Sequence, residues 1–375
     1  MRPSELENDS KRHIRNRSSR SLGLRLPEED RVSAWRGVVV LYSDIEACQP
    51  QADSEPLADL ETVSTAKAIA RIIQSRLGGD SRAVPGHAPL VKTLAPYPPD
   101  HYVVFNLYEG LSGVPGDEAE AARTLEQLGY RFTGARSQAL ALALNKAQAA
   151  ERLSQAGVLT PPWRVFCSAD QVSADAVQAL SFPLIVKPLA EDSSVGIDLQ
   201  SVVADLDALR HRVAQLIDAQ HQDALVSTFI DGREFSAAIW GSPPVVLPVS
   251  EIDFVGIEKP AERIVSFAAK WQATSTEYLR TPVICPARIT PELERHIKQV
   301  SLAAWRAIGG IGYGRVDMRV RGEHVFVLEV NPNPSLAADA GFARSAQAAG
   351  YEYADMIIKI LSDIPKETHV SDSPG

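Results

Sequence analysis

Cysteine and long apolar runs are both scarce in this chain, and each scarcity excludes a class of protein. The three cysteines, Cys48, Cys167 and Cys285, lie far apart and form no C-x-x-C pair. This spacing argues against a zinc site or a disulfide framework, and it indicates a reducing, cytoplasmic setting. No apolar stretch approaches the roughly 18 residues that a membrane-spanning helix requires. We therefore expect no membrane partner.

An excess of basic residues is also missing. The chain has 47 acidic residues against 38 basic ones, which gives a formal charge of −9. Because broad contact with phosphates requires positive charge, we expect no nucleic-acid partner. Hydrophobic residues make up 45% and charged residues 23% of the 375 residues. These values are typical of a globular protein that is long enough for two or three compact units.

The two ends of the chain are polar. Residues 1–34 are rich in Arg and Ser and lack the apolar core of a secretory signal. Because acidic residues are scattered through them, a transit peptide is disfavoured, and we predict a disordered tail. Residues 366–375 are predicted to be a loose tail as well.

The most informative stretch is residues 312–336. Two alternating apolar runs, residues 315–320 and 324–330, flank a short polar turn that carries Gly322. Alternation on both sides of a glycine-containing turn predicts a β-hairpin.

Acidic residues lie inside this predicted hairpin. Asp317 interrupts the first run, Glu329 ends the second, and Asn331 follows two residues later. Since side chains alternate along a strand, Glu329 and Asn331 share a face, and antiparallel pairing can bring Asp317 beside them. Carboxylate and amide oxygens suit Mg²⁺. Scattered surface acids are the alternative, but the apolar character of both strands and Arg315, two residues before Asp317, favour a metal and phosphate site.

A second signal is a lysine within an apolar strand. Residues 182–188 read FPLIVKP, and Lys187 is flanked by apolar residues. A buried lysine needs an anion, either a nucleotide phosphate or an internal carboxylate. The run Ser193, Ser194, Val195, Gly196 follows, and its backbone N–H groups could hold a phosphate. Alone it also fits an ordinary turn, and the spacing of a Walker loop is absent.

These motifs resemble a known family. Gly-Arg-Val-Asp at 314–317, followed by Leu-Glu-Val-Asn-Pro-Asn-Pro at 328–334, resembles the metal-binding end of the ATP-grasp ligases, most closely the D-alanine–D-alanine ligases. Residues 268–287 open with Ala-Lys-Trp and end with Cys-Pro-Ala, and they resemble the mobile lid of these enzymes. The likeness extends from about residue 38 to residue 361.

The resemblance implies an α/β (α+β) architecture, the ATP-grasp fold preceded by a parallel α/β domain. The residues agree, because apolar strand patterns at 38–42 and 102–107 alternate with helical patterns at 60–77 and 116–129. We predict an N-terminal domain over 35–135, a central ATP-grasp subdomain over 136–228, and a C-terminal subdomain with the metal site over 229–365.

The resemblance also implies the roles of site residues. Asp317, Glu329 and Asn331 would bind Mg²⁺, or Mn²⁺. The catalytic residues would be Arg315, Lys270 and Ser194. The residues that would contact ATP are Lys146, Lys187, Ser193, Ser194, Val195, Gly196, Ile230, Glu234 and Lys270. The acidic and basic pair that meets adenine in the family is replaced here by Ser227 and Thr228.

The implied activity is an ATP-dependent carboxylate–amine ligase that forms an amide through an acyl phosphate, with small-molecule substrates and, by analogy, a homodimeric state. The Ser-Ala-Glu motif of the family's first-substrate site is absent, and Asp339 and Arg344 lie where the second substrate is held. We therefore predict a substrate pair other than two D-alanines. The alternatives are a catalytically silent ATP-binding protein and an ATP-dependent carboxylase or phosphotransferase.

Overall fold

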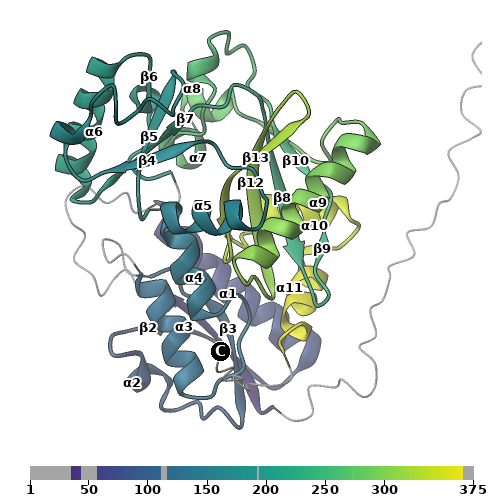
Figure 1. The fold of residues 1–375 in the computed structure, drawn as a ribbon. Helices are drawn as coiled ribbons and strands as arrows, with labels where there is room; N and C mark the ends of the chain where they lie inside the picture. The colour runs from purple at the N-terminus through teal and green to yellow at the C-terminus, as the bar shows by residue number, and fades with distance from the viewer. Residues whose placement is uncertain (1–34, 44–56, 111–115, 192–193, 273, 366–375) are drawn as a thin grey trace, which may run out of the picture. The chain divides into compact units, whose positions relative to one another are not determined.

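The first sheet is parallel and formed by the N-terminal part of the chain. Its strand order is β2-β1-β3, and every residue of β1 and β3 is buried, as expected where both faces of a parallel sheet are covered. The computed structural model describes residues 35–43, 57–110, 116–191, 194–272 and 274–365 (Figure 1). The predicted tails and Ser193 lie outside these residues. The elements of this part are β1 (Gly37–Ser43), α1 (Leu57–Leu77), β2 (Asp80–Gly86), α2 (Leu90–Leu94), β3 (Tyr102–Leu107), α3 (Asp117–Gln127) and α4 (Ser137–Leu144).

The second sheet is antiparallel and carries Lys187. Its strand order is β4-β7-β5-β6. Apolar residues of α6, including Leu209, Val213 and Leu216, pack with Leu184 and Val186 of β5 in one core. This packing covers one face of the sheet. The elements are α5 (Lys146–Gln155), β4 (Trp163–Phe166), η2 (Ala169–Gln171), β5 (Leu184–Pro188), η3 (Leu199–Ser201), β6 (Val202–Val203), α6 (Leu206–Gln220) and β7 (Ala224–Thr228).

The third sheet contains the predicted hairpin. Its order is β11-β10-β8-β12-β13, with β9 paired to β8. Helix α9 packs against it through Trp305, and a Cβ on Gly314 of β12 would lie 2.2 Å from the indole ring, so only glycine fits there. The elements are β8 (Arg233–Trp240), β9 (Val245–Val246), β10 (Ser250–Ile252), η4 (Pro260–Glu262), α7 (Phe267–Trp271), α8 (Thr276–Leu279), β11 (Val283–Ile284), α9 (Pro291–Ala307), β12 (Tyr313–Arg321) and β13 (His324–Asn331).

Two closing helices join the N-terminal sheet to the C-terminal one. Met356 and Phe342, from α11 (Tyr353–Ser362) and α10 (Gly341–Ala348), share a core with Val38 of β1 and Trp240 of β8. Residues from Trp35 onward form one compact unit. Among the described residues, no helix combines the length and the apolarity needed to cross a bilayer.

The α/β fold and the hairpin are confirmed, as are the predicted strands and helices of the N-terminal domain. Strand β2 was missed. The subdomain boundaries after residues 135 and 228 stay predictions.

Candidate active site

A cavity of about 850 Å³ is lined by residues from β5, β8, β12 and β13. Its shape brings together side chains that are far apart in the sequence. Eleven of the predicted site residues line it: Lys146, Lys187, Ser194, Val195, Ile230, Glu234, Lys270, Arg315, Asp317, Glu329 and Asn331. A cavity of this size is sufficient for a nucleotide-sized ligand.

One wall of the cavity is the acidic face of the hairpin. In the antiparallel register, Asp317 lies opposite Glu329, and Arg315 lies opposite Asn331. The register then shifts, and Leu328 has no opposite residue in the described pairing. Such a bulge changes the direction of side chains along a strand. Here it lets both Leu328 and Glu329 line the cavity.

Asp317 is held by two neighbours. The Arg315 guanidinium donates to both of its oxygens, with Nε 2.8 Å from Oδ1 and Nη2 2.9 Å from Oδ2. Ser236 of β8 lies opposite Asp317 and donates its hydroxyl to Oδ1 at 2.6 Å. Burial alone would raise the pKa of Asp317, but the charge of Arg315 and these hydrogen bonds hold that pKa below its ordinary value. The carboxylate therefore stays ionised at neutral pH.

The donor set fits Mg²⁺. Asp317, Glu329 and Asn331 supply hard oxygens from one wall, and Mg²⁺ commonly takes one or two carboxylates and completes its shell with phosphate oxygens and water. The described residues contain no cluster of three or more His, Cys, Asp or Glu placed for a metal. A divalent cation would therefore depend on the phosphates of a bound nucleotide for the rest of its shell.

Lys187 lines the same cavity from β5. Within the part of the chain that the structure describes, its ammonium makes no hydrogen bond or ion pair with another residue. Burial lowers its pKa, while the charge of Glu329 opposes that shift. An ammonium in a cavity that is near carboxylates but forms no ion pair with them is suited to contact an anionic ligand. The internal salt bridge considered from sequence is absent among the described residues.

The loop after β5 contains two residues with a left-handed backbone. Ser194 has φ 65° and Gly196 has φ 70°. A Cβ on Gly196 would lie 2.9 Å from Pro188 Cγ, so glycine lets the loop approach the end of β5. The Lys146 ammonium donates to the carbonyl of Glu191, just before the loop. Lys146 therefore connects the start of α5 to this loop.

The residues that the family resemblance places near the base and sugar of ATP also line the cavity, among them Ser227, Thr228, Ile230 and Glu234. Thr228 accepts a hydrogen bond from the Ser181 N–H at 3.1 Å, so its hydroxyl is already engaged. Sequence reasoning missed Arg319, whose guanidinium donates to Glu234. Arg319 lies two residues after Asp317 and four after Arg315, so strand alternation places all three on one face. This spacing could have identified Arg319 as a candidate site residue.

Lys270 lies on α7, the helix of the predicted lid. Ser266 caps this helix, and its hydroxyl accepts from the Ala269 N–H at 3.2 Å. The Phe267 N–H donates to the Ile197 carbonyl at 3.2 Å, which joins the helix to the loop after β5.

Cys285 lies near the end of the same predicted lid segment. Burial raises the pKa of its thiol, which disfavours the thiolate that a catalytic cysteine requires.

Comparisons with known proteins agree with this geometry. Residues 153–362 match the family model described as D-ala D-ala ligase C-terminus. The chain is 32% identical to the D-alanine–D-alanine ligase of Desulforudis audaxviator over 249 residues, which cover 66% of this chain and 77% of that protein. The chain belongs to the D-alanine–D-alanine ligase family.

One further relative and two solved structures extend the comparison. An uncharacterized protein of Sinorhizobium fredii, y4sG, is 32% identical over 76% of this chain and 82% of that protein. The crystal structure of the Bacillus anthracis D-alanine–D-alanine ligase complexed with ATP aligns with a TM-score of 0.67 and 21% identity over 88% of this chain and 97% of that one. The crystal structure of VanG D-Ala:D-Ser ligase from Enterococcus faecalis aligns with a TM-score of 0.66 and 19% identity, over 88% of this chain and 100% of that one. The protein therefore has the ATP-grasp fold of this ligase family.

Several carboxylates line the part of the cavity near Asp339 and Arg344, where the family resemblance predicts the second substrate to bind. The Arg344 Nε donates to the backbone carbonyl of Asp339 at 2.8 Å, so this cation is engaged by the chain itself. Burial and the charge of Asp339 raise the pKa of Glu61, whereas Ser335 and Lys270 lower it. The carboxylates that line this part are Glu61, Glu109, Glu118 and Asp339.

Proposed function

We propose that this protein is an ATP-dependent ligase that joins a small carboxylic acid to an amine through an acyl phosphate, a reaction of the acid–amino-acid ligase type. One observation carries the proposal. The antiparallel register sets Asp317 opposite Glu329 on a cavity that is also lined by Lys187, whose ammonium forms no ion pair within the described part of the chain. Two carboxylates for a metal and a cation for phosphates are the requirements of phosphoryl transfer.

The proposed first step joins the substrate carboxylate to the γ-phosphate. A carboxylate oxygen forms a bond to phosphorus, the bond from phosphorus to the bridging oxygen of ADP breaks, and ADP leaves with that electron pair. Lys146, Lys187 and Lys270 offset phosphate charge, and the Ser194–Gly196 backbone is assigned to hold the phosphates. Asp317, Glu329 and Asn331 would hold Mg²⁺, which supplies further neutralisation of the phosphate charge.

The second step forms the amide. The amine nitrogen attacks the carbonyl carbon of the acyl phosphate, phosphate leaves, and the nitrogen releases a proton. Arg315 is assigned to stabilise the negative charge that develops on the carbonyl oxygen. Because water would hydrolyse the acyl phosphate, the segment that carries Lys270 is assigned to exclude it.

The substrates are proposed to differ from a pair of D-alanines. The relatives are named as a D-alanine–D-alanine ligase and a D-Ala:D-Ser ligase, and each of these activities joins two amino acids. Here Asp339 and Glu61 line the substrate end, and the guanidinium of Arg344 is already bonded to a carbonyl. A second substrate with a free carboxylate would be repelled by these acids, so an amine with less negative charge is favoured.

The proposal is tested by ADP release from purified protein with Mg-ATP. The panel contains D- and L-amino acids, dipeptides and small amines, tested in pairs. Glu329→Ala removes a proposed metal ligand, and Glu323→Ala, in the exposed turn of the same hairpin, is the matched control. The expected result is ADP release that requires both a carboxylate and an amine, that Glu323→Ala retains, and that Glu329→Ala lowers at least about 100-fold, since metal charge stabilisation is worth several kcal/mol.

Two results would contradict the proposal. ADP release that needs no amine and yields a stable phosphorylated product would identify a phosphotransferase. Tight ATP binding with no turnover across the panel would favour a catalytically silent nucleotide-binding protein.

A further inference from the structure

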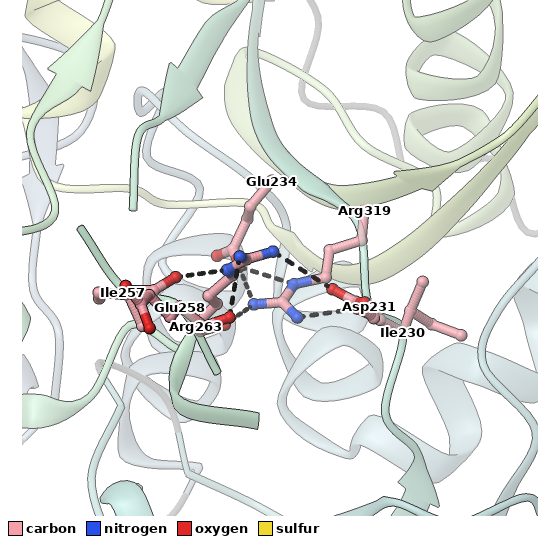
Figure 2. A network of polar contacts seen from close by, with 7 residues as sticks. All are labelled: Ile230, Asp231, Glu234, Ile257, Glu258, Arg263 and Arg319. Carbon is pink, nitrogen blue, oxygen red and sulfur yellow. Dashed lines mark hydrogen bonds and ion pairs between the residues drawn. The ribbon is translucent and has the colours of Figure 1, made fainter. Parts of the chain in front are cut away.

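Arg319 lines the cavity and makes polar contacts with three separate segments of the chain (Figure 2). Its Nη1 donates to the Ile230 carbonyl at 2.8 Å, and its Nη2 donates to the Arg263 carbonyl. Its Nε and Nη2 donate to Glu234 at 2.9 and 2.7 Å. One guanidinium therefore joins the residues after β7, the segment that leads to α7, and strand β8.

The guanidinium is almost completely buried. The Arg319 side chain is 4% exposed and that of Glu234 is 12% exposed. The rings of Phe229 and Phe254 lie 4.7 and 5.7 Å from the guanidinium carbon. Buried charges of this kind persist when each neutralises the other, so the pair is a fixed part of the cavity wall.

Both bonds to Glu234 end on the same oxygen. The Nε and Nη2 groups of Arg319 each donate to Oε2. Arg319 also lies directly opposite Glu234 in the β8–β12 register, which limits the rotation of both side chains. Among the described residues, no group donates a hydrogen bond to Oε1. This oxygen is left to accept a hydrogen bond from a ligand in the cavity.

We infer that Arg319 is a positioning residue for the ribose of the bound nucleotide. It holds Oε2 of Glu234 so that Oε1 accepts from a ribose hydroxyl, and through Ile230 it fixes the backbone beside the base. The inference rests on the proposed ATP-dependent function. It goes beyond that function because it assigns nucleotide-sugar recognition to a residue that does not itself touch the sugar.

The experiment compares the binding of ATP and 2′-deoxy-ATP to the full-length protein by titration calorimetry with Mg²⁺. The readout is the ratio of the two dissociation constants. We expect the wild-type protein to bind ATP roughly tenfold more tightly, the value of one hydrogen bond to a charged group. Arg319→Met should bring the ratio close to one, and Arg319→Lys, which keeps the charge beside Glu234, should lower it to an intermediate value.

A matched control lies one residue away from Glu234. Arg233 of β8 also forms an arginine–glutamate pair, in which Nε and Nη2 donate to the two different oxygens of Glu251 at 2.7 Å each, and neither residue lines the cavity. Arg233→Met should leave the ratio unchanged. If Arg319→Met does not fold, Arg319→Lys carries the test alone.

The outcomes separate this inference from the proposed function. If the variants at Arg319 lose affinity for both nucleotides equally and keep the wild-type ratio, Arg319 is only structural and the inference is wrong. The inference also fails if the wild-type protein binds ATP but does not discriminate against 2′-deoxy-ATP, and the proposed function then stands. If the wild-type protein binds neither nucleotide, the proposed function fails together with the inference.

Discussion

Asp317 of β12 lies directly opposite Glu329 of β13, in the last pair before the register shift between Asp317 and Met318. The carboxylates thus share one wall of the cavity although eleven residues separate them in the chain. Arg315 and Ser236 hold the first of them in place. The second is close enough to Lys187 to influence its pKa. The paired carboxylates are therefore linked electrostatically to the lysine on β5.

Asp317→Asn tests the electrostatic balance of this wall. Because the folded-state pKa of Asp317 is depressed, its ionised form stabilises the fold above the ordinary pKa of an aspartate, about 3.9, and this contribution is lost as the pH falls through the lower folded-state pKa. We expect the variant to lose about 2 kcal/mol of unfolding free energy at pH 7. Urea unfolding should show the difference from wild type shrinking as the pH falls below about 4. A difference that stays constant across that range would contradict the depressed pKa.

Lys187→Met separates ligand binding from folding. Burial lowers the folded-state pKa of Lys187, so the charged lysine costs stability at neutral pH. We expect the unfolding free energy of the variant to be about 1 kcal/mol higher than that of the wild type. Between the folded-state pKa and about 10.4, the unfolded state binds more protons than the folded state, so the stability of the wild type rises with pH. The difference in unfolding free energy between the variant and the wild type therefore becomes smaller as the pH rises. ATP affinity should fall at least roughly tenfold, since an opposite charge at the phosphates is lost.

The control for this variant is Lys92→Met, because Lys92 is exposed on α2 and does not line the cavity. It should change neither ATP affinity nor stability by more than about 0.5 kcal/mol. If Lys187→Met instead destabilised the protein strongly and kept its ATP affinity, Lys187 would be a structural cation.

Gly196→Ala tests the loop after β5. The residue has φ 70°, and a Cβ would lie 2.9 Å from Pro188 Cγ, so the loop or the end of β5 must move. Gly157→Ala is the matched control, since Gly157 has φ 75° and a Cβ there would meet nothing within 4 Å. Both variants should lose about 1 kcal/mol of stability from the backbone, but only Gly196→Ala should weaken ATP binding, by roughly tenfold or more. Equal ATP affinity in the two variants would show that the loop does not hold the phosphates.

The hairpin and its acids could be predicted because strand alternation is a local property. The spacing of Glu329 and Asn331 placed them on one face, and the turn at Gly322 defined which strands pair. Lys187 stood out for the same reason, as a cation within a short apolar run. The homodimer predicted from the family resemblance stays a prediction.

The contacts of Arg319 and Ser236 could not be predicted, because they depend on the register between β8 and β12. Ser236 and Asp317 are 81 positions apart, and Arg319 and Glu234 are 85 apart. A strand pattern predicts which residues share a face, but it does not specify which residue of a distant strand lies opposite. Strand β2 was missed for a local reason, since Pro85 interrupts it and is tolerated only because the strand lies at the edge of its sheet.

Isotope transfer shows whether the substrate carboxylate is phosphorylated before the amine attacks. The substrate carboxylate that supports the fastest ADP release is labelled with ¹⁸O, and the inorganic phosphate produced during turnover is analysed by mass spectrometry. We predict one ¹⁸O atom in each phosphate, because the oxygen that attacks phosphorus leaves with it when the amide forms. Unlabelled phosphate would show that the carboxylate was not phosphorylated, and the proposed acyl-phosphate mechanism would then be wrong.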